Sequence, residues 1–125
     1  MGGSTASTAP GQSAARAEIL ERFAQLVRRH YHADLYLFGS HSRGTAGPHS
    51  DYDLVAVSAF FAEQPILRRA LDRRKLWREA GGWGIPLDLH CLTPEEFAAE
   101  TGGFGYLGAA KRHRELVRIK PRDAA

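Results

Sequence analysis

The chain has 125 residues, and its 43% hydrophobic and 25% charged fractions are ordinary for a soluble globular protein with room for one modest core. Its apolar stretches are too short to span a membrane, and the N-terminus lacks the features of a signal peptide. A net charge of +3 does not by itself indicate nucleic-acid binding. The single cysteine, Cys91, excludes an internal disulfide and favours a cytoplasmic location.

Residues 1–13 are mainly glycine, serine, threonine, alanine and proline, so we expect a flexible N-terminal tail there. From about Ala14 to Tyr31, apolar residues recur at spacings of three and four, which predicts an amphipathic helix. This helix opens the domain, which we place at residues 14–120. Residues 121–125 are expected to form a C-terminal tail.

Three short apolar runs predict β-strands at Leu35–Phe38, Tyr52–Ala59 and Ile85–Leu92. Between the second and third runs, Gln64 to about Ala80 predicts a helix that is rich in arginine. Two interpretations of its basic residues stay open. They form a solvated face whose aliphatic stems cover apolar surface, or a docking surface for an acidic partner or for RNA.

After the third strand, Thr93 and Pro94 predict the start of a helix, with threonine as the cap and acidic residues in the first turn. A further short helix is expected from Phe104 to Arg114, and an edge strand from Leu116 to Ile119. These elements together predict an α/β fold, a single domain with a small mixed β-sheet flanked by helices.

Aspartates stand in two of the apolar runs. Asp51 and Asp53 are two residues apart, so on a strand both side chains would project from the same face. Asp88 lies in the third run and shares a face with Pro86 and His90. Because buried carboxylates need a partner and close carboxylates repel each other, the three acids predict a shared divalent-cation site.

Residues 39–54, GSHSRGTAGPHSDYDL, resemble the signature of the DNA polymerase β-like nucleotidyltransferase superfamily. Gly39-Ser40, ten further residues and then Asp51-x-Asp53 fit this signature without a gap. The segment is most similar to the small stand-alone bacterial branch, the minimal nucleotidyltransferases of the MNT type. The resemblance implies a polymerase β-like nucleotidyltransferase fold. It also implies transfer of a nucleoside monophosphate from an NTP, with ATP as the default, to a hydroxyl with release of pyrophosphate.

The resemblance also implies the metal chemistry. Asp51 and Asp53 would bridge two Mg²⁺ ions, and Asp88 would complete the site nearer the attacking hydroxyl. There Asp88 would lower the pKa of that hydroxyl or accept its proton.

For the phosphate groups, the resemblance implies roles for three residues. Gly39 would let the backbone approach a phosphate without a Cβ in the way. Ser40 would offer a hydroxyl and an amide at the start of a short helix, and Arg43 would contact the departing pyrophosphate. Without this motif, the same residues would be interpreted as a turn glycine, a helix cap and an exposed cation.

The acceptor is open. Only 33 residues follow Leu92, too few for a sizeable substrate domain, so we expect the acceptor to lie on a separate protein. In the minimal branch, the usual partner is a small helical HEPN protein that the transferase adenylylates as part of a toxin–antitoxin pair. The basic helix around Arg68–Arg78 is a candidate docking face. The alternatives are an aminoglycoside-type enzyme acting as a dimer and a non-catalytic antitoxin that neutralises its partner by contact.

Overall fold

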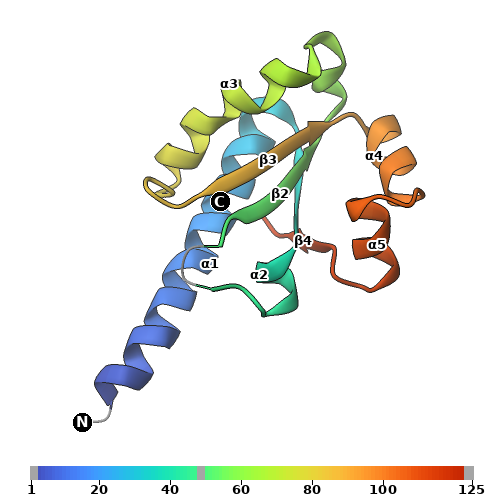
Figure 1. The fold of residues 1–125 in the computed structure, drawn as a ribbon. Helices are drawn as coiled ribbons and strands as arrows, with labels where there is room; N and C mark the ends of the chain where they lie inside the picture. Colours follow the sequence, from blue (N-terminus) through green and yellow to red (C-terminus); the bar gives the residue numbers. More distant parts are fainter. Residues whose placement is uncertain (1–2, 48–49, 123–125) are drawn as a thin grey trace.

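The computed structural model describes residues 3–47 and 50–122. One mixed sheet forms its centre, with the strand order β3-β2-β1-β4 (Figure 1). The strands are β1 (Asp34–Phe38), β2 (Tyr52–Val57), β3 (Leu87–Leu92) and β4 (Val117–Ile119). β1 pairs antiparallel with β2 and β4, whereas β2 and β3 run parallel. The predicted small mixed sheet and its C-terminal edge strand are therefore confirmed.

Helices lie on both sides of this sheet (Figure 1). Their bounds are α1 (Gly3–Tyr31), α2 (Ser40–Arg43), the 3₁₀ helix η1 (Ala59–Glu63), α3 (Ile66–Glu79), α4 (Pro94–Thr101) and α5 (Tyr106–Arg112). α1 and α3 pack together on one side, and α4 and α5 contact each other on the other side. Within the described ranges, none of these helices has the length and apolar character needed to cross a membrane.

The larger core lies between the sheet and the α1–α3 pair. Its fully buried side chains include Phe23 and Val27 of α1, Leu35 and Leu54 of the strands, and Phe61 of η1. Phe23 and Val27 are one helical turn apart, so they face the same side of α1. The periodicity that predicted this helix is therefore the periodicity of its buried face.

A smaller apolar cluster lies on the opposite face of the sheet. It joins Phe38 and Val55 of the strands to Leu107 and Ala110 of α5. The predicted cap of α4 is also present, because the Thr93 side chain and the N3 glutamate form a reciprocal capping box. These contacts hold α4 and α5 beside the sheet and leave the start of β2 and β3 free for polar residues.

α1 is longer than the sequence predicts. It begins at Gly3, whereas the expected helix starts near Ala14 and residues 1–13 are expected to be a flexible tail. The predicted boundary follows the apolar periodicity, which begins only at Ile19. Since the earlier turns carry no apolar face, no pattern marks them as helical. Residues 1 and 2 lie outside the described part of the chain.

Arg122, which lies in the segment expected to be a C-terminal tail, contacts α1. The backbone N–H of Arg122 donates to the carbonyl of Glu21 in α1 at 3.0 Å. The guanidinium of Arg122 lies 3.6 Å from the carboxylate of Glu18. The start of the expected tail is thus bound to α1, and residues 123–125 lie outside the described residues.

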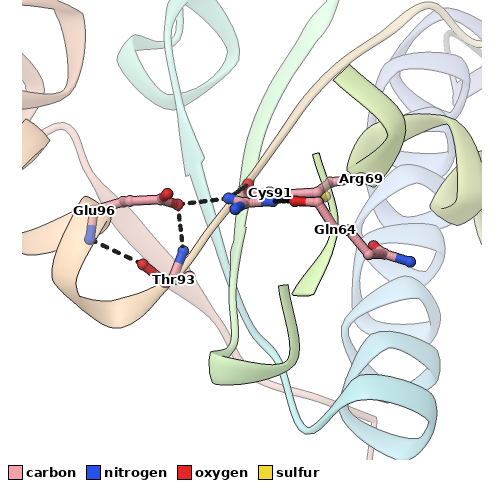
Figure 2. Close-up of polar contacts among 5 residues, drawn as sticks. All are labelled: Gln64, Arg69, Cys91, Thr93 and Glu96. Carbon is pink, nitrogen blue, oxygen red and sulfur yellow. Dashed lines mark hydrogen bonds and ion pairs between the residues drawn. The ribbon is translucent and has the colours of Figure 1, made fainter. Parts of the chain in front are cut away.

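The basic helix α3 does not expose all of its arginines. Arg69 and Arg73 are only 4% and 1% exposed. Figure 2 shows the Arg69 guanidinium reaching from α3 across β3 toward α4. It donates to the carbonyls of Gln64 (2.9 Å) and Cys91 (3.1 Å) and to the carboxylate of Glu96 (2.5 Å). These bonds offset the loss of water around the buried cation.

Arg73 is matched in a different way. Its guanidinium lies over the ring of Tyr31, 3.7 Å from the centroid, and also faces Phe61 at 4.7 Å. It donates to the Gln64 side chain at 2.7 Å and to the Arg69 carbonyl at 3.1 Å. Both interpretations of the basic helix are therefore wrong for Arg69 and Arg73. Basic residues of this helix that do remain exposed are Arg68, Arg74, Lys75 and Arg78.

Candidate active site

The turn between β1 and α2 places Gly39 against the start of β2. Gly39 has a φ of 79°, and a Cβ added there would lie 2.1 Å from Oδ2 of Asp53. Because the backbone conformation and the close contact both disfavour a side chain, only glycine fits this position. The motif glycine thus has a role beyond the expected one, since it makes room for the Asp53 carboxylate.

Asp53 and Asp88 are register partners on the parallel strands β2 and β3, and both line one pocket. Partial burial, then the charge of Asp88 and then that of Asp51, raise the pKa of Asp53 above its ordinary value of 3.8. The imidazoles of His90 and His41 act in the opposite direction. His90 Nε2 lies 3.4 Å from the Asp88 carboxylate. The two aspartates therefore repel each other, and nearby groups relieve this only in part.

Asp51 stands at the margin of this pair. β2 begins at Tyr52, so Asp51 precedes the strand, and its exposed side chain is not part of the pocket lining. It is close enough for its charge to act on Asp53. Within residues 3–47 and 50–122, no three Asp, Glu, His or Cys side chains form a group that could hold a metal ion. The structure therefore brings Asp53 and Asp88 together and leaves Asp51 outside.

The predicted phosphate-binding residues Gly39, Ser40 and Arg43 line the same pocket as the two aspartates. The Arg43 guanidinium is about half exposed and lies 3.8 Å from the carboxylate of Glu115. The hydroxyl of Ser42 donates to the backbone carbonyl of Glu115. These contacts fix α2 against the segment before β4 and keep a cation at the pocket.

His41, to which the sequence analysis gave no role, holds the loop that precedes β2. Its ring stacks on Tyr52 with centroids 3.7 Å apart, and its Nε2 lies 3.1 Å from the carbonyl of Ser50. The Ser50 hydroxyl in turn accepts a hydrogen bond from the Gly47 N–H at 2.9 Å. These contacts fix the backbone directly before Asp53.

The pocket has a volume of about 600 Å³, and much of its wall comes from the part of the chain after Leu92. The further lining residues are Phe38, His90, Leu92, Glu100, Tyr106, Leu107, Ala109, Ala110 and Glu115. The sequence predicts no site in this part of the chain, because the wall forms only when α5 packs beside the sheet. One available indication was the glycine-rich segment GGFGY at residues 102–106, which carries two aromatic residues.

The chain resembles known proteins in sequence and in fold. The profile of the nucleotidyltransferase domain family matches residues 16–117. A putative nucleotidyltransferase from Sulfolobus solfataricus has a similar structure, with a TM-score of 0.54 at 18% identity over 87% of this chain and 83% of that one. Another putative nucleotidyltransferase aligns over 88% of this chain and 99% of its own length, with 24% identity and a TM-score of 0.46. No curated protein matches the sequence.

Proposed function

Because this chain belongs to the nucleotidyltransferase domain family, we propose that it transfers AMP from ATP to a hydroxyl acceptor and releases pyrophosphate. The Asp53–Asp88 pair carries this proposal, since it shares one pocket with Gly39, Ser40 and Arg43. Transfer of a nucleotidyl group needs charge stabilisation at the reacting phosphate and a site for the leaving phosphates. The pocket offers residues suited to both tasks.

Nucleotidyltransferase domains generally use divalent metal ions, and we propose Mg²⁺ here: two ions would be held by Asp53 and Asp88 in the pocket and by Asp51, which would join them from the pocket margin. Carboxylate oxygens are the ligands that Mg²⁺ prefers. The raised pKa of Asp53 supports the fit, because part of its cause is repulsion from Asp88 and Asp51 that a cation would relieve. When bound, such ions stabilise the attacking and the leaving oxygens of an in-line displacement.

The protein's own residues supply the rest of the reaction. The acceptor oxygen attacks the α-phosphorus of ATP, the bond between the α-phosphorus and the bridging oxygen breaks, and pyrophosphate leaves. Asp88, which is exposed in the pocket, accepts the proton of the acceptor hydroxyl. Gly39 and Ser40 receive the triphosphate, and Arg43 neutralises the departing pyrophosphate by exchanging its contact with Glu115 for one with phosphate.

We propose that the acceptor hydroxyl lies on a small helical partner protein of the HEPN type, with the pair acting as toxin and antitoxin. The support is the resemblance to minimal nucleotidyltransferases and the exposed basic residues of α3. Among these, Arg74 and Arg78 border a groove of about 430 Å³ that also contains the exposed Trp83. An acidic partner surface would be attracted to this groove. Arg69 and Arg73 are excluded because both are buried.

Intact-mass spectrometry of the chain, a candidate partner and Mg-ATP tests the reaction and the acceptor together. The partner should gain the mass of one AMP residue for each hydroxyl modified. Asp88→Asn should slow this gain at least about 100-fold, while the matched control Glu63→Gln, an exposed acid outside the pocket, should not. Wild-type turnover by Asp88→Asn would remove Asp88 from the mechanism.

The same mixture separates the alternatives. Reversing the charges of Arg74 and Arg78 together should slow partner modification more at low salt than at high salt, because screening already weakens long-range attraction. Rapid modification of an aminoglycoside by the isolated chain, with an unmodified partner, would favour the drug-modifying alternative. Neutralisation of the partner without a change in its mass would favour a contact-only antitoxin.

A further inference from the structure

An exposed tyrosine forms part of the wall of the active-site pocket. Tyr106 lines the pocket that contains Asp53 and Asp88, yet the residue is 89% exposed. Phe104, two residues earlier, is 99% exposed and is not part of the pocket lining. Aromatic side chains that line a pocket commonly contact the ligand that it binds. Because Tyr106 is exposed and also lines the pocket, its ring is available to contact a bound ligand.

The turn that carries Tyr106 is closely packed. Arg112 donates from its guanidinium to the carbonyl of Gly103 at 2.8 Å, which bridges the start of the turn and the end of α5. A Cβ added at Gly108 would lie 1.9 Å from the same carbonyl, so α5 approaches the turn more closely than any side chain would allow. The backbone on both sides of Tyr106 is thus fixed, and its ring is presented by a preorganised segment.

The pocket changes character along β3. Asp88, His90 and Leu92 all line it, so its wall runs from a carboxylate to an apolar side chain over about 13 Å of strand. Leu92 packs with the apolar cluster that contains Leu107, the residue next to Tyr106. A pocket of about 600 Å³ is large enough for a small organic ligand. The carboxylate end accepts an anionic group only through a bound cation, and Gly39, Ser40 and Arg43 beside it suit phosphate, so a ligand that matches both ends joins a metal-bound phosphate to an apolar group.

We propose that Tyr106 stacks on the base of the bound nucleoside triphosphate and so fixes the nucleoside while the phosphates lie near Gly39 and Arg43. This inference rests on the proposed function. Stacking uses the face of the base and not its edge, so Tyr106 contributes affinity for any nucleotide and little choice between bases. Tyr106 is thus a nucleotide-binding residue supplied by the part of the chain in which the sequence revealed no site.

Isothermal titration with two ligands tests the proposal. Tyr106→Ala should weaken binding of Mg-ATP about 5- to 150-fold, the effect of losing one base–aromatic stack. The same variant should bind Mg-tripolyphosphate, which has no base, as tightly as the wild type does. Unchanged tripolyphosphate binding also shows that the variant is folded. Tyr106→Phe keeps the ring and should bind Mg-ATP within about twofold of the wild type.

Phe104→Ala is the matched control, because it removes an equally exposed ring from the same turn and should leave both affinities unchanged. Wild-type affinity for Mg-ATP in Tyr106→Ala would overturn the inference, even if AMP transfer were slower, because the ring would then serve the acceptor. Equal weakening of ATP and tripolyphosphate would also overturn it, since the loss would lie in the fold or the phosphate site. A wild-type chain that binds neither ligand would overturn the proposed function as well.

Discussion

A charged cluster lies beside each end of β3, and the two clusters differ in how their charges are stabilised. Near its end, the arginine cluster (Arg69, Arg73 and Glu96) is largely buried, and its guanidiniums meet carbonyls, a carboxylate and aromatic rings. At its start, the aspartate pair (Asp53 and Asp88) lies in an open pocket, where two like charges face each other. The paired charges of the arginine cluster hold structural elements together. The unpaired negative charge of the aspartate pair lies in a pocket, where it is available to a ligand.

The two clusters have different effects on the strand that they share. The arginine cluster connects α3, β3 and α4, so it fixes the strand that carries Asp88 (Figure 2). The aspartate pair works against folding, because the raised pKa of Asp53 means that its ionised form is disfavoured in the folded state. Two carboxylates that repel each other stay close only if the surrounding structure holds their strands in place.

Removing a buried guanidinium should give the largest loss of stability. Arg69→Met removes the guanidinium that donates to the carboxylate of Glu96 and to two carbonyls. We expect a loss of about 3 kcal/mol in the free energy of unfolding, at the low end for a broken buried pair, because the Glu96 side chain is 35% exposed. Urea denaturation at neutral pH measures it. Arg68→Met, on the exposed face of the same helix, should change stability by less than about 0.5 kcal/mol. Equal losses of stability in the two variants would contradict this view of the arginine cluster, because Arg69 would then behave as a surface residue.

From the sequence we expected Asp51, Asp53 and Asp88 to share a site, and the structure brings Asp53 and Asp88 together, whereas both interpretations of Arg69 and Arg73 were wrong. The motif spacing identified Asp53, and Asp88 stood out because a carboxylate in an apolar strand is rare without a function. Arg69 and Arg73 resemble any basic residues on a helix, since a long apolar stem with a charged end is compatible with both burial and exposure. Only the positions of Glu96 and the Cys91 carbonyl, both distant in sequence, decide that Arg69 is buried.

The helices and strands also show which features local sequence predicts and which depend on tertiary packing. Local patterns located each strand and the cap at Thr93 to within a few residues, because periodicity and capping depend on neighbours in sequence. The early turns of α1 lack such a pattern. The contribution of Tyr106 to the pocket depends on how α5 packs across the sheet, which no local rule describes.

The space for the Asp53 carboxylate depends on Gly39. Gly39→Ala puts a Cβ within 2.1 Å of that carboxylate at a φ of 79°. We expect a loss of about 1–3 kcal/mol from backbone strain, together with weaker nucleotide transfer. Gly44→Ala is the matched control, because its φ is also positive but a Cβ there meets nothing within 4 Å. Gly44→Ala should lower the free energy of unfolding by about 1 kcal/mol and leave nucleotide transfer unchanged. Thermal unfolding and the mass assay, run on both variants, separate strain from displacement of Asp53.

The free energy of unfolding at acid pH tests the role of Glu96 in the arginine cluster. The bonds from Arg69 and Thr93 hold the pKa of Glu96 below its ordinary value of 4.5. Because the folded pKa is lowered, this stabilisation is present above pH 4.5 and is lost as the pH falls through the folded pKa. Glu96→Gln should therefore cost about 1 kcal/mol at pH 7 and lose stability less steeply below pH 4.5. Urea titrations at several pH values test this, with Glu95→Gln as control. An unchanged acid slope in Glu96→Gln would show that the pair does not stabilise the fold.

The smallest expected effect has the opposite sign and concerns the aspartate pair. The pKa of Asp53 is raised, so its contribution to stability is full below pH 3.8 and is lost as the pH rises through the folded pKa. At pH 7 without divalent metal, Asp53→Asn removes a like charge opposite Asp88 and should raise the free energy of unfolding by about 0.2–1 kcal/mol. Asp34→Asn is the matched control, because Asp34 pairs with Arg28 at 2.7 Å and its loss should be neutral or destabilising.

Added Mg²⁺ should stabilise the wild type and do so less for Asp53→Asn, since only a chain that binds the ion gains from it. A clear loss of stability in metal-free Asp53→Asn would mean that a structural partner holds this carboxylate, and the contrast between the two ends of β3 would then fail.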